Sequence, residues 1–357
     1  MSDIKSEART EWYETFIDGG YVPDSVLRYG IKTLLNKRLN NVNKGSLEEN
    51  QRQKMQFVRT LQERPVAIHT DKANEQHYEV PTEFMRLSLG ERMKYSGCLF
   101  DEPNTTLDEA EEKMMELYCI RAELEDGMKL LDLGCGWGSL GLFLAEKYPN
   151  SQVTCLSNSS TQKIHIMEVA NQKGLSNINV ITGNVLDFEF EKKPEFDRIL
   201  TIEMLEHMKN YMELFQKLSN WLKAGGKLFV HIFCHKSIPY DFDENENNSW
   251  MARYFFTGGT MPSLDLFLYF QHHFNLKSLW YVNGTHYGKT CNAWLKKLDK
   301  NYAKCIEHLA KGYGNKEEAI KWFYRWRVFY IACEETFNFG DGNEWGIGHY
   351  LFTKKNY

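Results

Sequence analysis

The chain is 357 residues long, with 42% hydrophobic and 25% charged residues and a formal net charge of −5. This composition supports one large or two modest folded domains and excludes a disordered chain. A mildly acidic chain offers no broad basic face for nucleic acid. No apolar run approaches the ~20 residues that a bilayer-spanning helix needs, so we expect no integral membrane contact.

Eight scattered cysteines show no paired zinc spacing, and the N-terminal residues are too polar for a secretory signal. Such a pattern is typical of reduced thiols inside the cell. We therefore expect a cytoplasmic protein with no bound metal.

Residues 1–105 are predicted to form an N-terminal helical region, because apolar residues recur every three or four positions between Val26 and Leu39. The stretch 40–64 is polar, which favours a solvated helix or a linker. Pro81 and Gly90 interrupt the pattern that follows. Helical signal resumes at Thr106, with acidic residues in the first turn.

Strands and helices alternate in residues 106–235, which predicts right-handed crossovers and a parallel sheet of the Rossmann-like α/β class. Strands are expected at 128–134, 152–157, 177–183, 196–203 and 227–233, and helices at 140–148, 161–173 and 205–222. Residues 236–357 are predicted to form a helical and aromatic cap insertion that returns to the sheet. Helices are expected there at 294–309 and 317–337, and an edge strand at 348–355.

The strongest local signal is LLDLGCGWGSL, residues 130–140, in which Gly134, Gly136 and Gly138 follow a strand that ends at Asp132. Glycine permits a tight turn and lets a bound molecule approach the backbone. The spacing differs from that of dinucleotide enzymes and of the phosphate loop. It is typical of Rossmann-like S-adenosylmethionine-dependent methyltransferases, in which an acid matching Asp132 lies near the cofactor's ammonium group. A plain strand-to-helix turn is the alternative.

Amides stand where dinucleotide folds carry an acid for the ribose. The second strand ends in Leu156, Ser157 and Asn158, with Gln162 one helical turn further on. Asn184 follows the third strand, where methyltransferases of this class pack the adenine. These departures weaken the case for NAD as the cofactor more than the case for S-adenosylmethionine. Both asparagines could also be ordinary loop residues.

Glu203, Glu206 and His207 follow the fourth strand, at the edge where open α/β sheets bind ligands. If a helix begins near residue 204, the two acids lie on adjacent turns and face one cleft. Two carboxylates and an imidazole suit binding a cation or accepting a proton. An equally weighted alternative is that the acids only complement the helix dipole.

Several motifs together carry a family resemblance, among them HYEVPTEF, MKYSGCLF, LDLGCGWGSL, IEMLEHMKNY, FVHIFCHK and WRVFYIACEETF. From about residue 75 to residue 355 the chain resembles the coclaurine N-methyltransferase-like family of plant amine and alkaloid N-methyltransferases, in the cyclopropane-fatty-acid-synthase superfamily. The resemblance implies S-adenosylmethionine as cofactor, S-adenosylhomocysteine as product and no metal. It also implies methyl transfer to the nitrogen of an aromatic alkaloid or phenylalkylamine, within plant specialised metabolism.

The resemblance implies roles for single residues as well. Glu206 and His207 match the catalytic pair that positions or deprotonates the amine, with Glu203 beside them. The predicted substrate-binding residues are Glu79, His231, Tyr287 and Phe233. The predicted cofactor-binding residues are Tyr95, Ser96, Asp132, Gly134, Gly136, Leu156, Asn158, Gln162, Asn184 and Val185.

A lipid methyltransferase of the cyclopropane-synthase type is the alternative function. Lipid enzymes of the superfamily bind bicarbonate through residues whose counterparts here are Gly97, Glu206, His231 and Tyr287. Glycine at position 97 replaces their cysteine, which puts a bicarbonate base in doubt. A non-catalytic cofactor-binding regulator ranks last, because the Glu-His pair is intact.

Three features stay open at this point. Cys333 resembles a cysteine that lines the lipid enzymes' site, although a small buried thiol is the simpler interpretation. The acceptor amine and the number of methylations are not fixed by the sequence. The oligomeric state is likewise open, with a homodimer as one option.

Overall fold

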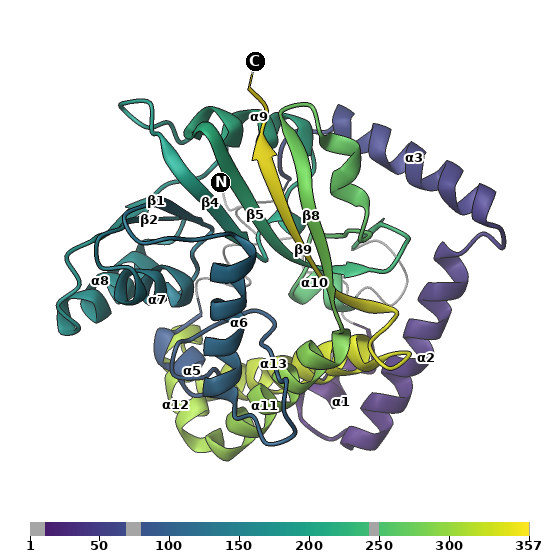
Figure 1. Cartoon of the computed structure of the whole chain (residues 1–357). Coiled ribbons are helices and arrows are strands. Elements are labelled where there is room, and N and C mark those ends of the chain that lie inside the picture. The colour runs from purple at the N-terminus through teal and green to yellow at the C-terminus, as the bar shows by residue number, and fades with distance from the viewer. Residues whose placement is uncertain (1–10, 69–79, 243–249, 357) are drawn as a thin grey trace, which may run out of the picture.

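The computed structural model describes residues 11–68, 80–242 and 250–356. Its centre is a seven-stranded sheet in the order β3-β2-β1-β4-β5-β9-β8 (Figure 1). The strands are β1 (Lys129–Leu133), β2 (Gln152–Ser157), β3 (Ile178–Thr182), β4 (Phe196–Ile202), β5 (Leu222–His235), β8 (Phe274–Val282) and β9 (Trp345–Lys354). Strands β1 to β5 pair in parallel, and β9 runs antiparallel to both of its neighbours. The predicted α/β class with a parallel sheet is confirmed.

Helices cover both faces of the parallel part of the sheet, because successive strand residues point to opposite sides. Leu130 packs in a hydrophobic cluster with α6 (Leu107–Arg121), α7 (Ser139–Lys147) and α8 (Ser160–Gln172). Leu131 and Leu133 pack in a second cluster with α9 (Tyr211–Trp221). Helix α6 begins where its acidic first turn predicts, at a capping box formed by Thr106 and Glu109.

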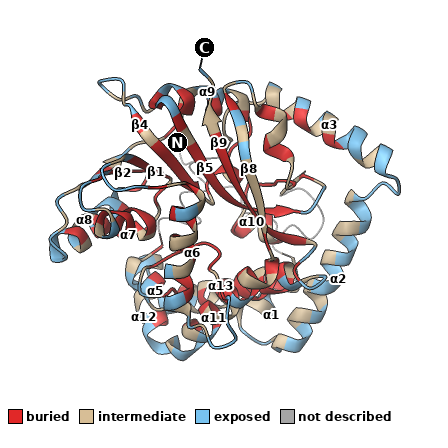
Figure 2. Ribbon diagram, in the orientation of Figure 1, coloured by how far each residue is buried: buried red, intermediate tan, exposed pale blue. Residues whose placement is uncertain are grey.

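The N-terminal region forms α1 (Glu14–Asp18), α2 (Asp24–Val42), α3 (Leu47–Glu63) and α5 (Thr82–Arg86). Most of α2 and α3 is exposed or half-buried (Figure 2). Arg28 of α2 forms ion pairs with Glu334 and Glu335. Val58 and Leu61 of α3 are buried in the cluster with α9. The polar stretch after residue 40 is therefore mainly a helix with one buried edge.

The C-terminal region supplies a helical layer and the remaining strands. It contains β6 (Tyr240–Asp241), α10 (Trp250–Tyr254), β7 (Thr260–Met261), the 3₁₀ helix η2 (Leu266–Phe270), α11 (Gly284–Lys300), α12 (Tyr302–Tyr313) and α13 (Lys316–Asn338). In Figure 1, α11, α12 and α13 lie together below the sheet, beside α1 and α5. The single helix predicted at 294–309 is wrong: α11 begins ten residues earlier and ends before Asn301, which separates it from α12.

The prediction of an edge strand at 348–355 is also wrong. Strand β9 lies between β5 and β8, and its first eight residues are buried. The edge strand is β8, which the sequence analysis missed, because FNLKSLWYV mixes polar and apolar residues without strict alternation.

The helix predicted at 205–222 is wrong at its start. A 3₁₀ turn, η1 (Leu205–His207), follows β4, and α9 begins only at Tyr211. The Asn210 side chain caps α9 by accepting a hydrogen bond from the Glu213 N–H. Asn210 therefore separates the predicted catalytic residues from the regular helix.

Candidate active site

The loop from β1 to α7 turns sharply at three glycines, all with positive φ: 76° at Gly134, 52° at Gly136 and 81° at Gly138. A Cβ at Gly134 or Gly138 would lie within 3 Å of Met204 or Ile166. A Cβ at Gly136 would meet no heavy atom within 4 Å. Close packing therefore also requires the outer two glycines, whereas Gly136 faces open space and is the one that a ligand can approach.

Two cavities adjoin at this loop. The aromatic cavity, with about 760 Å³ of empty volume, is lined by Met93, Tyr95, Ser96, Gly134, Cys135, Gly136, Trp137, Ser139, Ile202, Glu203, Glu206, His207, Phe233, Phe256, Tyr287, Cys291, Trp294, Phe329 and Cys333. The amide cavity, with about 620 Å³, is lined by Leu133, Gly134, Gly136, Leu156, Ser157, Asn158, Gln162, Gly183, Asn184, Val185, Met204, His207 and Met208. Gly134, Gly136 and His207 line both, so the two cavities meet beside the loop.

Glu203 stands directly after β4 in a left-handed backbone conformation, with φ of 47°. Such a conformation is costly for a residue other than glycine and is common at functional sites. The carboxylate accepts a hydrogen bond from the Gly97 N–H at Oε1 (3.1 Å) and from the Tyr287 hydroxyl at Oε2 (2.6 Å). His231 Nε2 lies 3.0 Å from Oε1. Burial raises the pKa of Glu203 to about 7, while Lys94, Tyr287 and Gly97 act to lower it.

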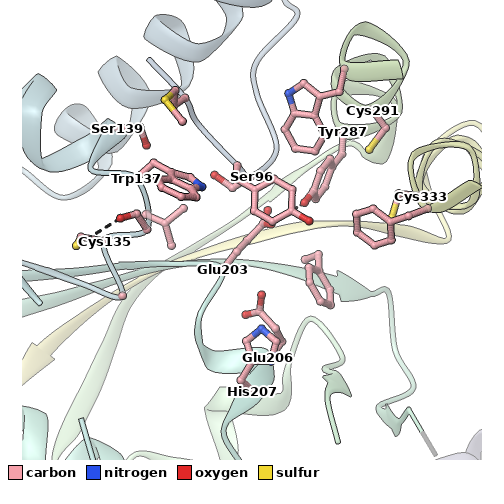
Figure 3. A pocket seen from close by; sticks show the side chains of 18 of the residues that line it. Ser96, Cys135, Trp137, Ser139, Glu203, Glu206, His207, Tyr287, Cys291 and Cys333 are labelled. Atoms are coloured by element: carbon pink, nitrogen blue, oxygen red, sulfur yellow. Dashed lines mark hydrogen bonds between the residues drawn. The ribbon is translucent and has the colours of Figure 1, made fainter. Parts of the chain in front are cut away.

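Glu206 and His207 lie in the η1 turn and also line the aromatic cavity (Figure 3). Burial and then the nearby Glu203 raise the pKa of Glu206 well above its ordinary value. Glu206 Oε2 is buried and has no hydrogen-bond partner within the described part of the chain. The His207 ring lies parallel to Phe256, with centroids 6.0 Å apart. A buried acid with one unpaired oxygen beside an imidazole suits a ligand that carries a proton or a positive charge.

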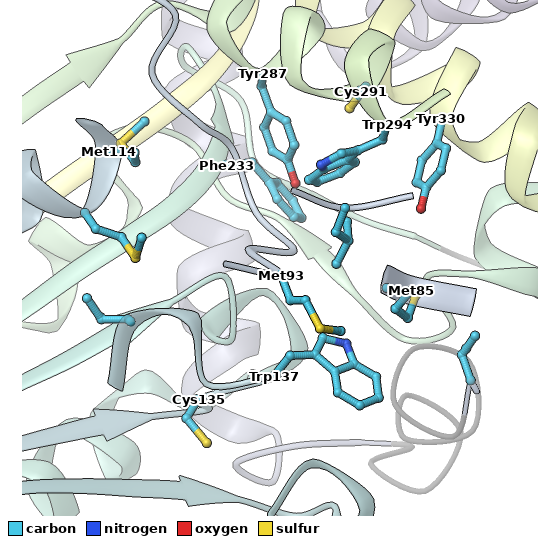
Figure 4. Close-up of a cluster of buried hydrophobic side chains, with 14 of the residues drawn as sticks. Met85, Met93, Met114, Cys135, Trp137, Phe233, Tyr287, Cys291, Trp294 and Tyr330 are labelled. Atoms are coloured by element: carbon cyan, nitrogen blue, oxygen red, sulfur yellow. The ribbon is translucent and has the colours of Figure 1, made fainter. Parts of the chain in front are cut away.

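Aromatic rings form much of the cavity wall, and several of them belong to the adjoining hydrophobic core (Figure 4). Tyr287 stacks on Phe337 with ring centroids 4.2 Å apart. Trp294 packs edge-on to Tyr287 and against Tyr95. These rings leave the polar groups of the cavity concentrated around Glu203 and Glu206, which suits an aromatic ligand with one polar or cationic centre.

Lys94 is a functional candidate that the sequence analysis missed. Its side chain is fully buried, and Nζ donates hydrogen bonds to the Ser96 hydroxyl and to the Gly97 carbonyl. These bonds hold the turn that presents the Gly97 N–H to Glu203. Lys94 lies in the quoted MKYSGCLF motif, but only the fold buries its positive charge near Glu203.

Apart from His207, the side chains that line the amide cavity are apolar or uncharged and polar, and no lysine or arginine is among the described lining residues. Gln162 Oε1 accepts a hydrogen bond from the Ser157 hydroxyl (2.6 Å). Gln162 Nε2 is buried, and no acceptor for it exists among the described residues. An unpaired buried donor is costly, so this cavity suits a ligand with hydrogen-bond acceptors and without phosphate. An adenosine group meets both conditions.

The sequence profile of the mycolic acid cyclopropane synthetase family matches residues 67–345. The chain belongs to this family. Within it, an (S)-coclaurine N-methyltransferase of Thalictrum flavum subsp. glaucum is 39% identical over 340 residues, which cover 94% of this chain and 93% of the relative. A pavine N-methyltransferase of the same plant is 38% identical over 341 residues, 95% of each chain. The resemblance predicted from the motifs is confirmed.

A crystal structure of coclaurine N-methyltransferase bound to N-methylheliamine and S-adenosylhomocysteine has the same fold, with a TM-score of 0.92 and 37% identity. The similarity covers 96% of this chain and 98% of that structure. The predicted Rossmann-like methyltransferase sheet with added helical regions is therefore confirmed.

Most of the residues predicted from the family lie at the two cavities. Tyr95, Ser96, Phe233 and Tyr287 line the aromatic cavity, as does Cys333. Leu156, Asn158, Gln162, Asn184 and Val185 line the amide cavity. Glu79 lies outside the described residues.

Two predicted residues line neither cavity. Asp132 is buried beneath the loop, where its carboxyl group accepts a hydrogen bond from the Gly141 backbone at the start of α7. The expected contact of Asp132 with the cofactor's ammonium group stays a prediction. His231 is buried behind Glu203 and reaches the aromatic cavity only through that carboxylate.

The residues predicted to correspond to the lipid enzymes' bicarbonate-binding groups have a different environment here. Gly97, His231 and Tyr287 all contact the Glu203 carboxylate. A Cβ at Gly97 would lie 2.5 Å from Ile347 and 3.2 Å from Tyr287, so a cysteine would not fit without movement. In this member of the family, three of the four groups hold a carboxylate of the chain itself.

Residues 11–68, 80–242 and 250–356 contain no group of three or more His, Cys, Asp and Glu side chains placed to hold a metal ion. None of the helices formed by those residues has the length and apolar character needed to cross a membrane.

Proposed function

We propose that this chain transfers a methyl group from S-adenosylmethionine to the nitrogen of an aromatic amine of the benzylisoquinoline type. The observation that carries the proposal is the buried Glu206 carboxyl group beside Glu203, whose Oε2 has no partner among the described residues, in a ring-lined cavity that meets the amide cavity at Gly136. The curated relatives above, which are named as alkaloid N-methyltransferases, support it.

The cofactor is S-adenosylmethionine, which supplies a methyl group already activated on a sulfonium sulfur. Gln162, Asn158 and Asn184 would hold its adenosine part in the amide cavity. The loop backbone at Gly134 and Gly136 would lie along its methionine part. The open space at Gly136 and Gln162 Nε2, which has no acceptor among the described residues, support this orientation. The reacting methyl group would then face the aromatic cavity.

The aromatic cavity binds the amine by its rings and by its charge. Ring faces such as those of Phe256 and Tyr287 stack on an aromatic substrate and attract a cation, at about 0.5–2 kcal/mol for a good contact. Glu203, when it is ionised, places a negative charge close to the nitrogen. Positioning the nitrogen in line with the methyl group supplies much of the rate acceleration.

The amine nitrogen must be neutral when it reacts, although most aliphatic amines are protonated at neutral pH. Glu206 takes this proton when its carboxyl group is ionised. Burial beside Glu203 raises the Glu206 pKa, which makes its carboxylate a stronger base than an exposed glutamate. His207 lines both cavities and is the second acceptor, for the proton that a methylated secondary amine releases.

A lipid methyltransferase remains the second candidate, because the family is named after the mycolic acid cyclopropane synthetases. Two features favour an amine as the methyl acceptor: the predicted counterparts of the bicarbonate-binding residues bind Glu203 instead, and Gly97 replaces the cysteine. The proposed compartment is the cytoplasm, which all eight cysteines as free thiols support. A homodimer and a substrate contact by Glu79 remain predictions.

The test is a competition between acceptor classes. The full chain is incubated with methyl-deuterated S-adenosylmethionine and either a panel of benzylisoquinoline and phenylalkylamine amines or vesicles of unsaturated phospholipid. Mass spectrometry of the products should find the label on an amine nitrogen. Label in the acyl chains, with none on any amine, would establish the lipid alternative instead.

A further inference from the structure

A buried line of hydrogen bonds leads from Glu203 away from the cavity. His231 Nε2 lies 3.0 Å from Glu203 Oε1, and His231 Nδ1 lies 2.8 Å from His349 Nε2. His349 Nδ1 in turn lies 2.7 Å from Arg121 Nη1. The two histidines face each other across β5 and β9 and are at most 1% exposed. Arg121 is the last residue of α6, half-buried over the Trp280 ring of β8.

The donors and acceptors along this line can be assigned from its outer end. A guanidinium group only donates, so Arg121 requires His349 Nδ1 to be the acceptor. Burial lowers the pKa of both histidines well below the ordinary value, so each carries one proton. The proton of His349 is therefore on Nε2, and that N–H donates to His231 Nδ1. His231 must then carry its proton on Nε2, where it donates to Glu203.

The opposite assignment has a different consequence for Glu203. If His231 carried its proton on Nδ1, its Nε2 would be an acceptor and would require a protonated Glu203 as donor. With Nε2 protonated, Glu203 instead receives three donors, from Gly97, Tyr287 and His231. Three donors stabilise the ionised carboxylate. The tautomer of His231 therefore decides which form of Glu203 the site favours.

We propose that Arg121, acting through His349 and alongside the Tyr118 hydroxyl, sets the tautomer of His231 and so holds Glu203 as a carboxylate. Arg121 and His349 line neither cavity, so they are positioning residues. The effect on methyl transfer rests on the proposed function, whereas the tautomers do not. The groups that face His231 are Lys94 from the loop before α6, Tyr118 and Arg121 from α6, Glu203 after β4 and His349 from β9.

Tyr118 is the second donor to consider, because its hydroxyl lies 2.9 Å from His231 Nδ1. It can keep His231 in the same tautomer when Arg121 is lost. Arg121→Met should therefore release the tautomer of His349 alone, and Arg121→Met combined with Tyr118→Phe should release that of His231 too. Tyr118→Phe by itself should change neither, because the line from Arg121 remains intact.

The direct test is ¹⁵N nuclear magnetic resonance of the full chain labelled at histidine, with signals assigned by His231→Gln and His349→Gln. The wild type should show both residues protonated on Nε2. Arg121→Lys keeps a donor and should preserve this pattern. Arg198→Met is the matched control, because Arg198 donates to the Ala122 and Glu123 carbonyls at the same end of α6. Wild-type His231 protonated on Nδ1, or unchanged tautomers in the double variant, would overturn the proposal.

Turnover of the amine identified above measures the consequence. The Arg121→Met/Tyr118→Phe variant should lose about three- to tenfold in kcat, the value of one hydrogen bond, with KM for S-adenosylmethionine changed less than about twofold. Arg121→Lys should retain most of the wild-type rate. A shifted tautomer with unchanged kcat would refute the link to Glu203. The tautomer measurement needs no substrate, so it distinguishes failure of this inference from failure of the proposed function.

Discussion

The Tyr287 hydroxyl donates a 2.6 Å hydrogen bond to Glu203 Oε2 and so ties α11 to the turn after β4. The two residues are 84 positions apart in sequence. Their contact joins the helical layer to the carboxyl edge of the sheet at the aromatic cavity. Together with Gly97 and His231, Tyr287 holds Glu203 from three separate parts of the chain.

Tyr287→Phe should therefore lower kcat by about tenfold while the fold is retained, because one donor to a charged group is lost and the ring still stacks on Phe337. Steady-state kinetics with the methylated amine and thermal unfolding measure the two effects. Tyr281→Phe is the matched control, since that hydroxyl donates to the Gly342 carbonyl away from both cavities. Equal loss of kcat in both variants would contradict the role of the contact.

Glu206→Gln should lower kcat by at least about a hundredfold, because the amide cannot accept the amine proton. The affinity for S-adenosylmethionine should change less than about twofold, as Glu206 does not line the amide cavity. Turnover and isothermal titration calorimetry measure the two quantities. An equal loss of affinity and turnover would indicate a structural role. Glu189→Gln, on the exposed side of the ion pair with Lys217, serves as the control.

Gly136→Val should abolish cofactor binding, because a side chain there would enter the space where the two cavities meet. The new residue also has to adopt a left-handed backbone, which costs about 1–2 kcal/mol by itself. Gly174→Val separates the two effects. Gly174 has a φ of 68° and nothing within 4 Å of a Cβ, but it lines neither cavity. Of the two variants, only Gly174→Val should bind the cofactor in calorimetry. Retained cofactor binding in Gly136→Val would refute the assignment of the loop to the cofactor site.

Asp132→Asn should stabilise the protein at pH 8 more than at pH 5. Burial raises the pKa of Asp132 in the folded protein to about 7. The folded state therefore binds this proton more tightly than the unfolded state does, and wild-type stability falls as pH rises between about 4 and 7. The asparagine removes this cost, so the gain in Tm over the wild type should grow across that range.

Asp197→Asn should have the opposite sign. Burial acts to raise the Asp197 pKa, but hydrogen bonds from Lys223 and the Lys129 backbone leave it below its ordinary value. Its ionised form stabilises the folded protein at neutral pH, so the variant should lower Tm there and differ little at low pH. Melting curves of both variants from pH 3 to pH 8 check the pair. A parallel shift of Asp132→Asn at every pH would contradict the buried-acid argument.

Local sequence patterns were sufficient for the parallel core and the glycine loop, whereas the catalytic role of Glu206 and His207 came from the family resemblance and stays a prediction. Alternating runs of buried strand and amphipathic helix specify the succession of elements along the chain from β1 to β5, because each element buries its own apolar face. The spacing of Gly134, Gly136 and Gly138 predicts a turn that leaves the backbone accessible to a ligand. Glu206 and His207 are adjacent in sequence, so any fold that brings one to the cavity brings the other close to it.

Tertiary structure alone decided how those groups are connected. The left-handed turn at Glu203 and the 3₁₀ turn after it replace the start of the predicted helix, and they aim Glu203 at Gly97, His231 and Tyr287. Strand β9 enters the sheet beside β5 and places His349 opposite His231, which no local pattern reveals. Such contacts depend on long-range register and on desolvation, and both arise only when distant segments pack together.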